Sequence, residues 1–171
     1  MPPPASTREN PRRIRAAIRY VVKGEAAIFY PAEREKSYGP AEDHEMTITD
    51  ARALRDKLSV AANGFTLLNH RTAVRDFFDE AQVQEVFVPE VVELARQVNG
   101  AAHVIAFGPV ARTDDPAGSQ GRLPSFGAHV DYGRRTIEDF TRQILGAEAD
   151  YWLSRRVVLM NFWRPITPVY S

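Results

Sequence analysis

The stretch Ala128-His129-Val130-Asp131-Tyr132 carries the sharpest chemical signal in the sequence. A long segment rich in Gly, Pro, Ser and Asp, residues 113–127, precedes it, and a helical pattern follows it. In a β-strand, residues two positions apart project from the same face of the sheet. We therefore predict that the stretch is a strand, and that the His129 imidazole and the Asp131 carboxylate point together into one site.

This pair of side chains matches part of a known type of metal site. An imidazole nitrogen and a carboxylate oxygen are two of the three protein ligands in the 2-His-1-carboxylate sites of Fe(II) oxygenases, which leave positions open for substrate and oxygen. The tripeptide alone is not specific, because many chains of 171 residues contain one by chance. A surface or structural His–Asp pair is the alternative interpretation.

Hydrophobic patterns on both sides predict strands first, then helices, then strands again. Strands are expected at residues 14–22, 26–30, 46–49, 64–68, 102–110 and 157–163. Helices are expected at 73–78, 89–98 and 137–145, the last with a capping-box-like start at Thr136 and Asp139. Residues 50–58 fit either element. This order lacks regular βαβ alternation, so it predicts an α+β fold with a mostly antiparallel sheet backed by helices.

Composition restricts the classes of partner and chemistry. Lys plus Arg and Asp plus Glu both number 22, and zero net charge argues against nucleic acid or an anionic membrane as the main partner. The absence of cysteine excludes disulfides, zinc–thiolate sites and cysteine nucleophiles. No apolar run has the length of a transmembrane helix or the form of a secretory signal, so we expect a cytoplasmic protein. Residues 1–13 are Pro-rich and polar, which predicts a disordered lead-in.

Six stretches, in order, resemble those of one protein family. They are Gly64-Phe65, His70 to Phe77, Pro89-Glu90 leading to Asn99-Gly100-Ala101, Val110 to Arg112, Ala128 to Tyr132, and Asn161 to Ile166. The chain resembles non-haem Fe(II)/2-oxoglutarate oxygenases of secondary metabolism. That family includes a protein associated with cephalosporin 7-alpha-methoxylation, gibberellin desaturase-like proteins and fungal endoperoxide-forming enzymes.

The resemblance implies a fold and a set of ligands. It implies a partial double-stranded β-helix, a cupin-like jelly roll, with Fe(II) and 2-oxoglutarate in its mouth. His129 and Asp131 match the family's first two iron ligands. The third ligand, a second His, and a basic residue that grips 2-oxoglutarate lie beyond the Trp-Arg-Pro block in such proteins. The four histidines here are His44, His70, His103 and His129, and none follows Asp131.

We expect particular roles for four other residues. Arg164 is a candidate to hold the acidic co-substrate through a bidentate contact, with a structural salt bridge as the alternative. Trp163 is expected to pack in the core rather than to form a substrate platform. His70 is expected to have a structural or capping role, and His103 to face solvent.

The resemblance also implies strands beyond Ser171. We therefore expect residues 14–171 to form a single oxygenase-like domain that is C-terminally truncated, with a degenerate member or completion by another chain as alternatives. The last predicted strand would then lack a neighbour, and an open apolar edge favours homo- or hetero-oligomers.

The expected function is that of an oxidoreductase that hydroxylates or desaturates a small secondary metabolite. A non-catalytic accessory or binding subunit of a natural-product pathway is the alternative. A methyltransferase is a third possibility, against which the absence of a glycine-rich nucleotide loop speaks.

Overall fold

The computed structural model of the 171-residue chain describes residues 11–25, 28, 38–115 and 127–167. The chain divides into two compact units, Met1–Gly127 and Ala128–Ser171. Residues 1–10 of the expected disordered lead-in lie outside the described residues, as do most of the expected strand at 26–30 and most of the segment 113–127.

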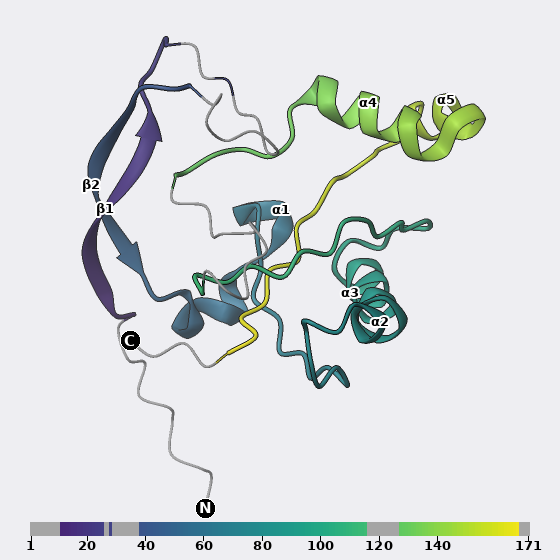
Figure 1. Ribbon diagram of the computed structural model, residues 1–171, viewed down its shortest axis with the longest axis horizontal. Coiled ribbons are helices and arrows are strands. Elements are labelled where there is room, and N and C mark those ends of the chain that lie inside the picture. The colour runs from purple at the N-terminus through teal and green to yellow at the C-terminus, as the bar shows by residue number, and fades with distance from the viewer. Residues whose placement is uncertain (1–10, 26–27, 29–37, 116–126, 168–171) are drawn as a thin grey trace, which may run out of the picture. The chain divides into compact units, whose positions relative to one another are not determined.

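The first unit opens with a curved ribbon of two antiparallel strands (Figure 1). Strand β1, Arg13–Val21, pairs with β2, Ala41–Thr49, and Ile18 lies opposite His44. This confirms the strand predicted at 14–22, and it extends the one predicted at 46–49 toward the N-terminus. In β1 the residues Ala16, Ile18 and Tyr20 are half-buried while their neighbours are exposed, so the period-2 alternation of the sequence does mark one covered face.

Two short helical segments follow the ribbon. The 3₁₀ helix η2, Ala51–Lys57, begins where the Asp50 side chain accepts a hydrogen bond from the Arg52 N–H, so the ambiguous segment 50–58 is helical. Helix α1, Val60–Asn63, is capped by Ser59 and ends at Gly64, which has a φ of 76°. The strand predicted at 64–68 is therefore wrong, because Gly64 is used to terminate a helix and no partner strand lies beside 65–68 among the described residues.

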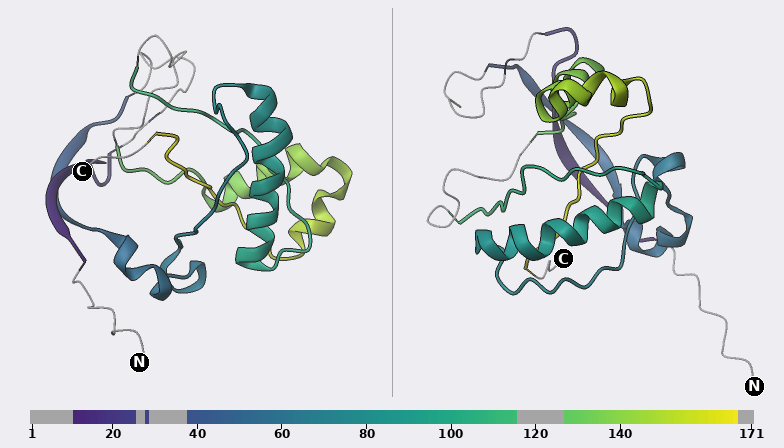
Figure 2. Two further views of the ribbon diagram at one scale, coloured as in Figure 1. Left: turned by 90° about the horizontal axis from the view of Figure 1, so that it is seen from below. Right: turned by 90° about the vertical axis from the view of Figure 1, so that its right-hand side faces the viewer.

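A long helix dominates the rest of this unit. Helix α2, Glu80–Gln82, continues through a π turn, η3, Val83–Phe87, into α3, Val88–Asn99, as Figure 2 shows. The helix predicted at 89–98 is confirmed, and it ends at Gly100 as the Asn-Gly signal indicated. The π turn does not interrupt the helix, because the N–H of Val88 still donates to the carbonyl of Val83.

The helix predicted at 73–78 is wrong. Its backbone N–H groups donate to side chains instead of to helical carbonyls: Ala73 to Glu90, Arg75 to Gln82, and Phe78 to Asp76. These N–H groups are therefore not bonded to the carbonyl four residues earlier, as a helix requires. The helix starts only after Asp79, whose carboxylate accepts from the N–H groups of Ala81 and Gln82.

The second unit is built around one amphipathic helix. Its elements are α4, Arg134–Leu145, the 3₁₀ turn η4, Gly146–Glu148, and α5, Ala149–Leu153. The predicted helix at 137–145 is confirmed, but it begins earlier, after Gly133, so the cap predicted at Thr136 is wrong and Thr136 lies inside the helix. An ion pair of 2.7 Å between Arg142 and Asp150 joins α4 to α5.

Three predicted strands are absent from the described residues. Segments 102–110, 128–132 and 157–163 are coil, and the sheet that the described residues form has two strands. Their apolar content indicates strand, but a strand also needs a neighbour to accept its backbone hydrogen bonds. Gly108, with a φ of 60°, also breaks the extended path of the first segment. The two-stranded antiparallel sheet and the helices agree with the predicted α+β class, and the jelly roll implied by the resemblance is not confirmed by the described residues.

Few side chains are buried in either unit. Among the described residues, the buried ones are Val74, Ala95, Thr141 and Ala149. None of the helices within the described ranges is both long and apolar enough to span a membrane.

The end of α3 gives a first testable prediction. Gly100 has a φ of 67° and open space around its Cβ position, so a side chain there meets backbone strain but no clash. Replacing Gly100 with Ala should lower the free energy of unfolding by about 1 kcal/mol. Gly100→Asn is the matched control and should lose less, because Asn tolerates the left-handed region. Urea unfolding measures both, and an Ala variant as stable as the wild type would contradict the assigned helix end.

The start of α2 gives a second prediction. Hydrogen bonds from the Gln82 side chain and backbone, and from the Ala81 N–H, lower the pKa of Asp79 below its usual value. A depressed pKa in the folded state means that the cap contributes stability above the unfolded pKa of about 3.9, and that this contribution is lost as pH falls through the folded pKa.

The stability difference between wild type and Asp79→Ala should therefore shrink when urea unfolding is repeated at pH 3 instead of pH 7. A difference that stays constant between these two pH values would show that Asp79 does not cap the helix as a carboxylate.

Candidate metal site

His129 and Asp131 are in contact at the start of the second unit. The Nε2 atom of His129 lies 3.1 Å from Oδ1 of Asp131, and the two side chains are 55% and 41% exposed. The prediction that they lie on a strand is wrong, because residues 128–131 are coil and belong to no strand. The side chains nevertheless meet, so the proximity comes from the local backbone path and not from strand parity.

The residues after Asp131 anchor it to helix α4. The Tyr132 ring packs edge-on against the Phe140 ring, with 5.9 Å between centroids. Gly133 is the N-cap of α4, and its carbonyl accepts the first helical hydrogen bond, from Ile137. The site is therefore held next to the N-terminus of a regular helix.

A residue from far along the chain completes the cluster. The side-chain amide of Asn161 donates from Nδ2 to Oδ2 of Asp131, across a separation of 30 residues. Both Asp131 oxygens therefore have a partner: Oδ1 faces His129, and Oδ2 accepts from Asn161. The contact brings together two stretches that the sequence places on either side of α4 and α5.

The pair has the spacing that one metal ion requires. Two cis ligands, each about 2.1 Å from an octahedral ion, lie about 3 Å apart. The 3.1 Å between the His129 nitrogen and the Asp131 oxygen agrees with this spacing, and it also agrees with an ordinary ion pair. Across the described ranges, no group of three or more His, Cys, Asp and Glu side chains gathers to hold a metal. An imidazole nitrogen and a carboxylate oxygen are donors that suit Fe(II), so the chemistry of the pair is compatible with that ion.

The neighbours of this cluster differ in exposure. Trp163, two positions beyond Asn161, is 86% exposed, so its predicted core packing is wrong. Val130, between the two candidate ligands, is also 86% exposed. Arg164 is half-buried, and its predicted contact with an acidic co-substrate stays a prediction.

A comparison with known families decides the affiliation of the chain. Residues 17–171 match the family described as an oxidoreductase/YMDC permease-like domain. The chain belongs to this family. The match covers both compact units and includes the His129–Asp131–Asn161 cluster.

Individual relatives of this chain are named as an oxidoreductase and as a dioxygenase. An oxidoreductase of Emericella nidulans is 28% identical over 137 residues, which is 74% of this chain and 46% of the relative. The Fe(II)/2-oxoglutarate-dependent dioxygenase NvfI of Aspergillus novofumigatus is 26% identical over 128 residues, which is 72% of this chain and 46% of the relative. The chain thus spans about half the length of these curated relatives.

A solved structure shares the fold. The iron and alpha-ketoglutarate-dependent endoperoxidase NvfI superposes with a TM-score of 0.70 at 21% identity, over 83% of this chain and 56% of the other. The fold of this chain is therefore similar to that of the solved endoperoxidase over the aligned residues.

Sequence reasoning missed a second imidazole–carboxylate pair. Nε2 of His44 lies 2.8 Å from Oε1 of Glu42 on strand β2, and the His44 ring packs edge-on against Tyr20. The two residues are two positions apart in a real strand, so the parity rule applied to His129 and Asp131 could have found them. This pair is a natural control for any metal-binding experiment.

The two remaining histidines have other surroundings. His70 Nε2 lies 3.8 Å from Oε2 of Glu90, and the Glu90 carboxylate also accepts from the Ala73 N–H, which agrees with a structural role. His103 is exposed, as expected.

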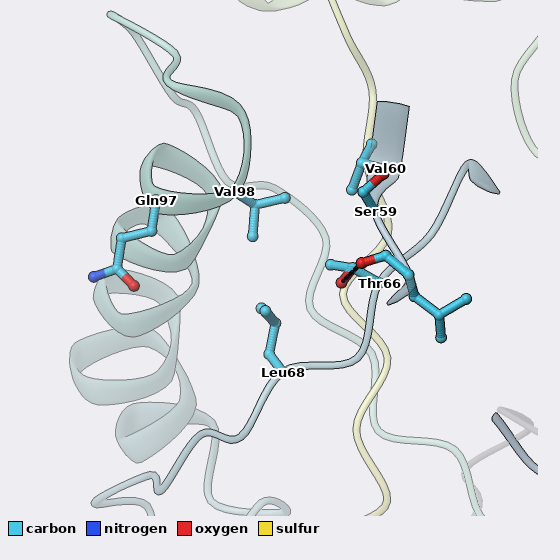
Figure 3. A pocket seen from close by; sticks show the side chains of 7 residues that line it. Ser59, Val60, Thr66, Leu68, Gln97 and Val98 are labelled. Carbon is cyan, nitrogen blue, oxygen red and sulfur yellow. Dashed lines mark hydrogen bonds between the residues drawn. The ribbon is translucent and has the colours of Figure 1, made fainter. Parts of the chain in front are cut away.

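The first unit contains a hollow of about 260 Å³. Leu68 and Val98 point toward it in Figure 3, and its lining is completed by Leu58, Ser59, Val60, Thr66 and Gln97. The lining contains no Asp, Glu, His, Lys or Arg side chain.

The exposure of Trp163 yields a third prediction. Trp163→Ala should change the free energy of unfolding by no more than about 0.5 kcal/mol, as expected for an exposed residue away from packing. Trp152→Ala is the matched control and should cost more, since Trp152 is half-buried, packs against Tyr151 and donates to Glu148. Urea unfolding followed by circular dichroism compares the two. A cost of about 3–5 kcal/mol for Trp163→Ala would restore the core interpretation.

Proposed function

We propose that this chain contributes His129 and Asp131 as two of the iron ligands of a Fe(II)/2-oxoglutarate-dependent oxygenase. The observation that carries the proposal is the 3.1 Å contact between one imidazole nitrogen and one carboxylate oxygen. Its family and its relatives, named as dioxygenases and as a hydroxylase/desaturase, support the same reaction class. The substrate class proposed is a small secondary metabolite that is hydroxylated or desaturated.

In this proposal, the residues of this chain bind the metal ion and set its ligand geometry. The His129 imidazole offers a nitrogen and the Asp131 carboxylate offers an oxygen, a donor set that suits Fe(II) and leaves most coordination positions to co-substrate, water or further protein ligands. Bound Fe(II) with 2-oxoglutarate supplies the oxidising chemistry, while the protein supplies ligand geometry.

Arg164 is the proposed cationic partner of the co-substrate. A guanidinium forms two parallel hydrogen bonds with a carboxylate, and 2-oxoglutarate carries two carboxylates. Arg164 lies in the same block as Asn161, which contacts Asp131. Arg164 is half-buried, which is compatible with an apolar stem packed on the protein and a guanidinium that reaches a ligand.

One observation favours a second candidate, a non-catalytic accessory or binding subunit. The described residues bring together the two candidate ligands, and among those residues no group of three or more His, Cys, Asp and Glu side chains gathers to hold a metal. A protein that keeps the family fold and a weak metal site would serve as a binding partner without turnover.

Metal binding tests the proposal through Mn(II), a redox-stable substitute for Fe(II). The full chain should bind one Mn(II) weakly, because two protein ligands leave most positions to water. His129→Ala and Asp131→Ala should each reduce the affinity by about tenfold or more, since removing a ligand costs at least as much as removing a residue that orients one.

Electron paramagnetic resonance of free Mn(II) measures this affinity. His44→Ala is the matched control and should bind like the wild type, because it removes the imidazole of the other pair. Micromolar or tighter binding that survives His129→Ala would show that the site lies elsewhere.

A further inference from the structure

The side chain of Asn161 stands beside the candidate ligands without being one of them. Its amide nitrogen donates to Oδ2 of Asp131, while Oδ1 of the same carboxylate lies 3.1 Å from His129. The donor assignment follows from chemistry, because a carboxylate only accepts and the amide oxygen cannot donate to it. The two oxygens of Asp131 are therefore distinguished by their partners.

We propose that Asn161 is a positioning residue for the metal-binding pair, which holds Asp131 so that Oδ1 faces the His129 imidazole. This inference rests on the proposed metal site and adds to it a residue that binds no metal. A free carboxylate rotates about its Cβ–Cγ bond and presents either oxygen, or both, to an ion. A hydrogen bond to Oδ2 removes that freedom and leaves Oδ1 for the ion.

The hydrogen bond from Asn161 matters because of where the two candidate ligands lie. His129 and Asp131 are on a coil, and their side chains are about half exposed, so neither strand pairing nor burial fixes them. From the N-terminal side of α4, the Tyr132–Phe140 contact anchors the backbone after Asp131. Asn161, from the segment after α5, is the described contact that acts on the carboxylate itself from the other side. Residues that orient a metal ligand in this way typically change metal affinity by about 10- to 100-fold.

The alternative is that Asn161 only closes a loop. The hydrogen bond joins residues 30 positions apart. If it only fastened the segment after α5, its loss would lower the stability of the fold but would not change the affinity for the metal ion. Two readouts separate these roles. One is Mn(II) affinity in variants of Asn161, and the other is the chemical shift of the Asn161 side-chain amide, which is measured without metal.

The experiment uses the full chain with Mn(II) as the probe. Asn161→Leu keeps the shape but removes the donor, and it should weaken Mn(II) binding by about tenfold or more while circular dichroism stays unchanged. Asn161→Gln keeps the amide on a longer stem and should recover part of the affinity. Gln143→Leu is the matched control, because it removes an exposed amide from α4, and it should bind like the wild type.

The amide signals give an independent test. In the wild type the Asn161 Nδ2 protons should be shifted away from those of a free Asn, and Asp131→Ala should return them to free values. Unshifted signals, or an Asn161→Leu variant that binds like the wild type, would overturn the inference while leaving the proposed function intact. A loss of affinity that Gln does not recover, together with lowered stability, would also overturn it in favour of the loop tie. A wild type that binds no Mn(II) would sink both proposals.

Discussion

The candidate metal site of the second unit depends on the contacts that the Asp131 carboxylate makes. It contacts His129 on one oxygen and accepts from Asn161 on the other, so it joins the segment before α4 to the segment after α5. A carboxylate has room for about four hydrogen bonds or metal contacts, so two partners leave capacity for an ion. Without Asp131, the His129 imidazole and the Asn161 amide would have no common acceptor. The segment before α4 and the segment after α5 would then lose the side-chain connection that this residue makes.

Elements that depend on local sequence were predicted well. The alternation of β1, the apolar face and Asn-Gly end of α3, and the apolar face of α4 all identified the right element, because these signals act within a few residues. The cap at Thr136 was wrong because Gly133 already starts the helix. Predicted strands such as 102–110 and 157–163 failed because strand formation depends on a neighbour, which a single segment cannot reveal.

The candidate site was predicted in part, and partly for the wrong reason. The spacing of His129 and Asp131 indicated side chains that meet, and they do meet, but from coil instead of from one strand face. The same spacing on a true strand, Glu42 and His44, was overlooked. The Asn161 contact could not be predicted, because it depends on how α4 and α5 return the chain over 30 residues. Trp163 has a large apolar side chain of the kind that usually lies in a protein core. It is nevertheless exposed, because the described residues bury few side chains.

Paramagnetic broadening of NMR signals by Mn(II) tests most directly whether His129 and Asp131 hold a metal ion. Substoichiometric Mn(II) added to the ¹⁵N-labelled chain should broaden the backbone signals of residues 128–132 and the side-chain amide of Asn161, because these atoms lie closest to the proposed ion. The backbone signals of Glu42 and His44 should be broadened less than those of residues 128–132, because the proposed ion binds at the other imidazole–carboxylate pair. Broadening centred on Glu42 and His44, or spread evenly over the acidic surface, would contradict the account.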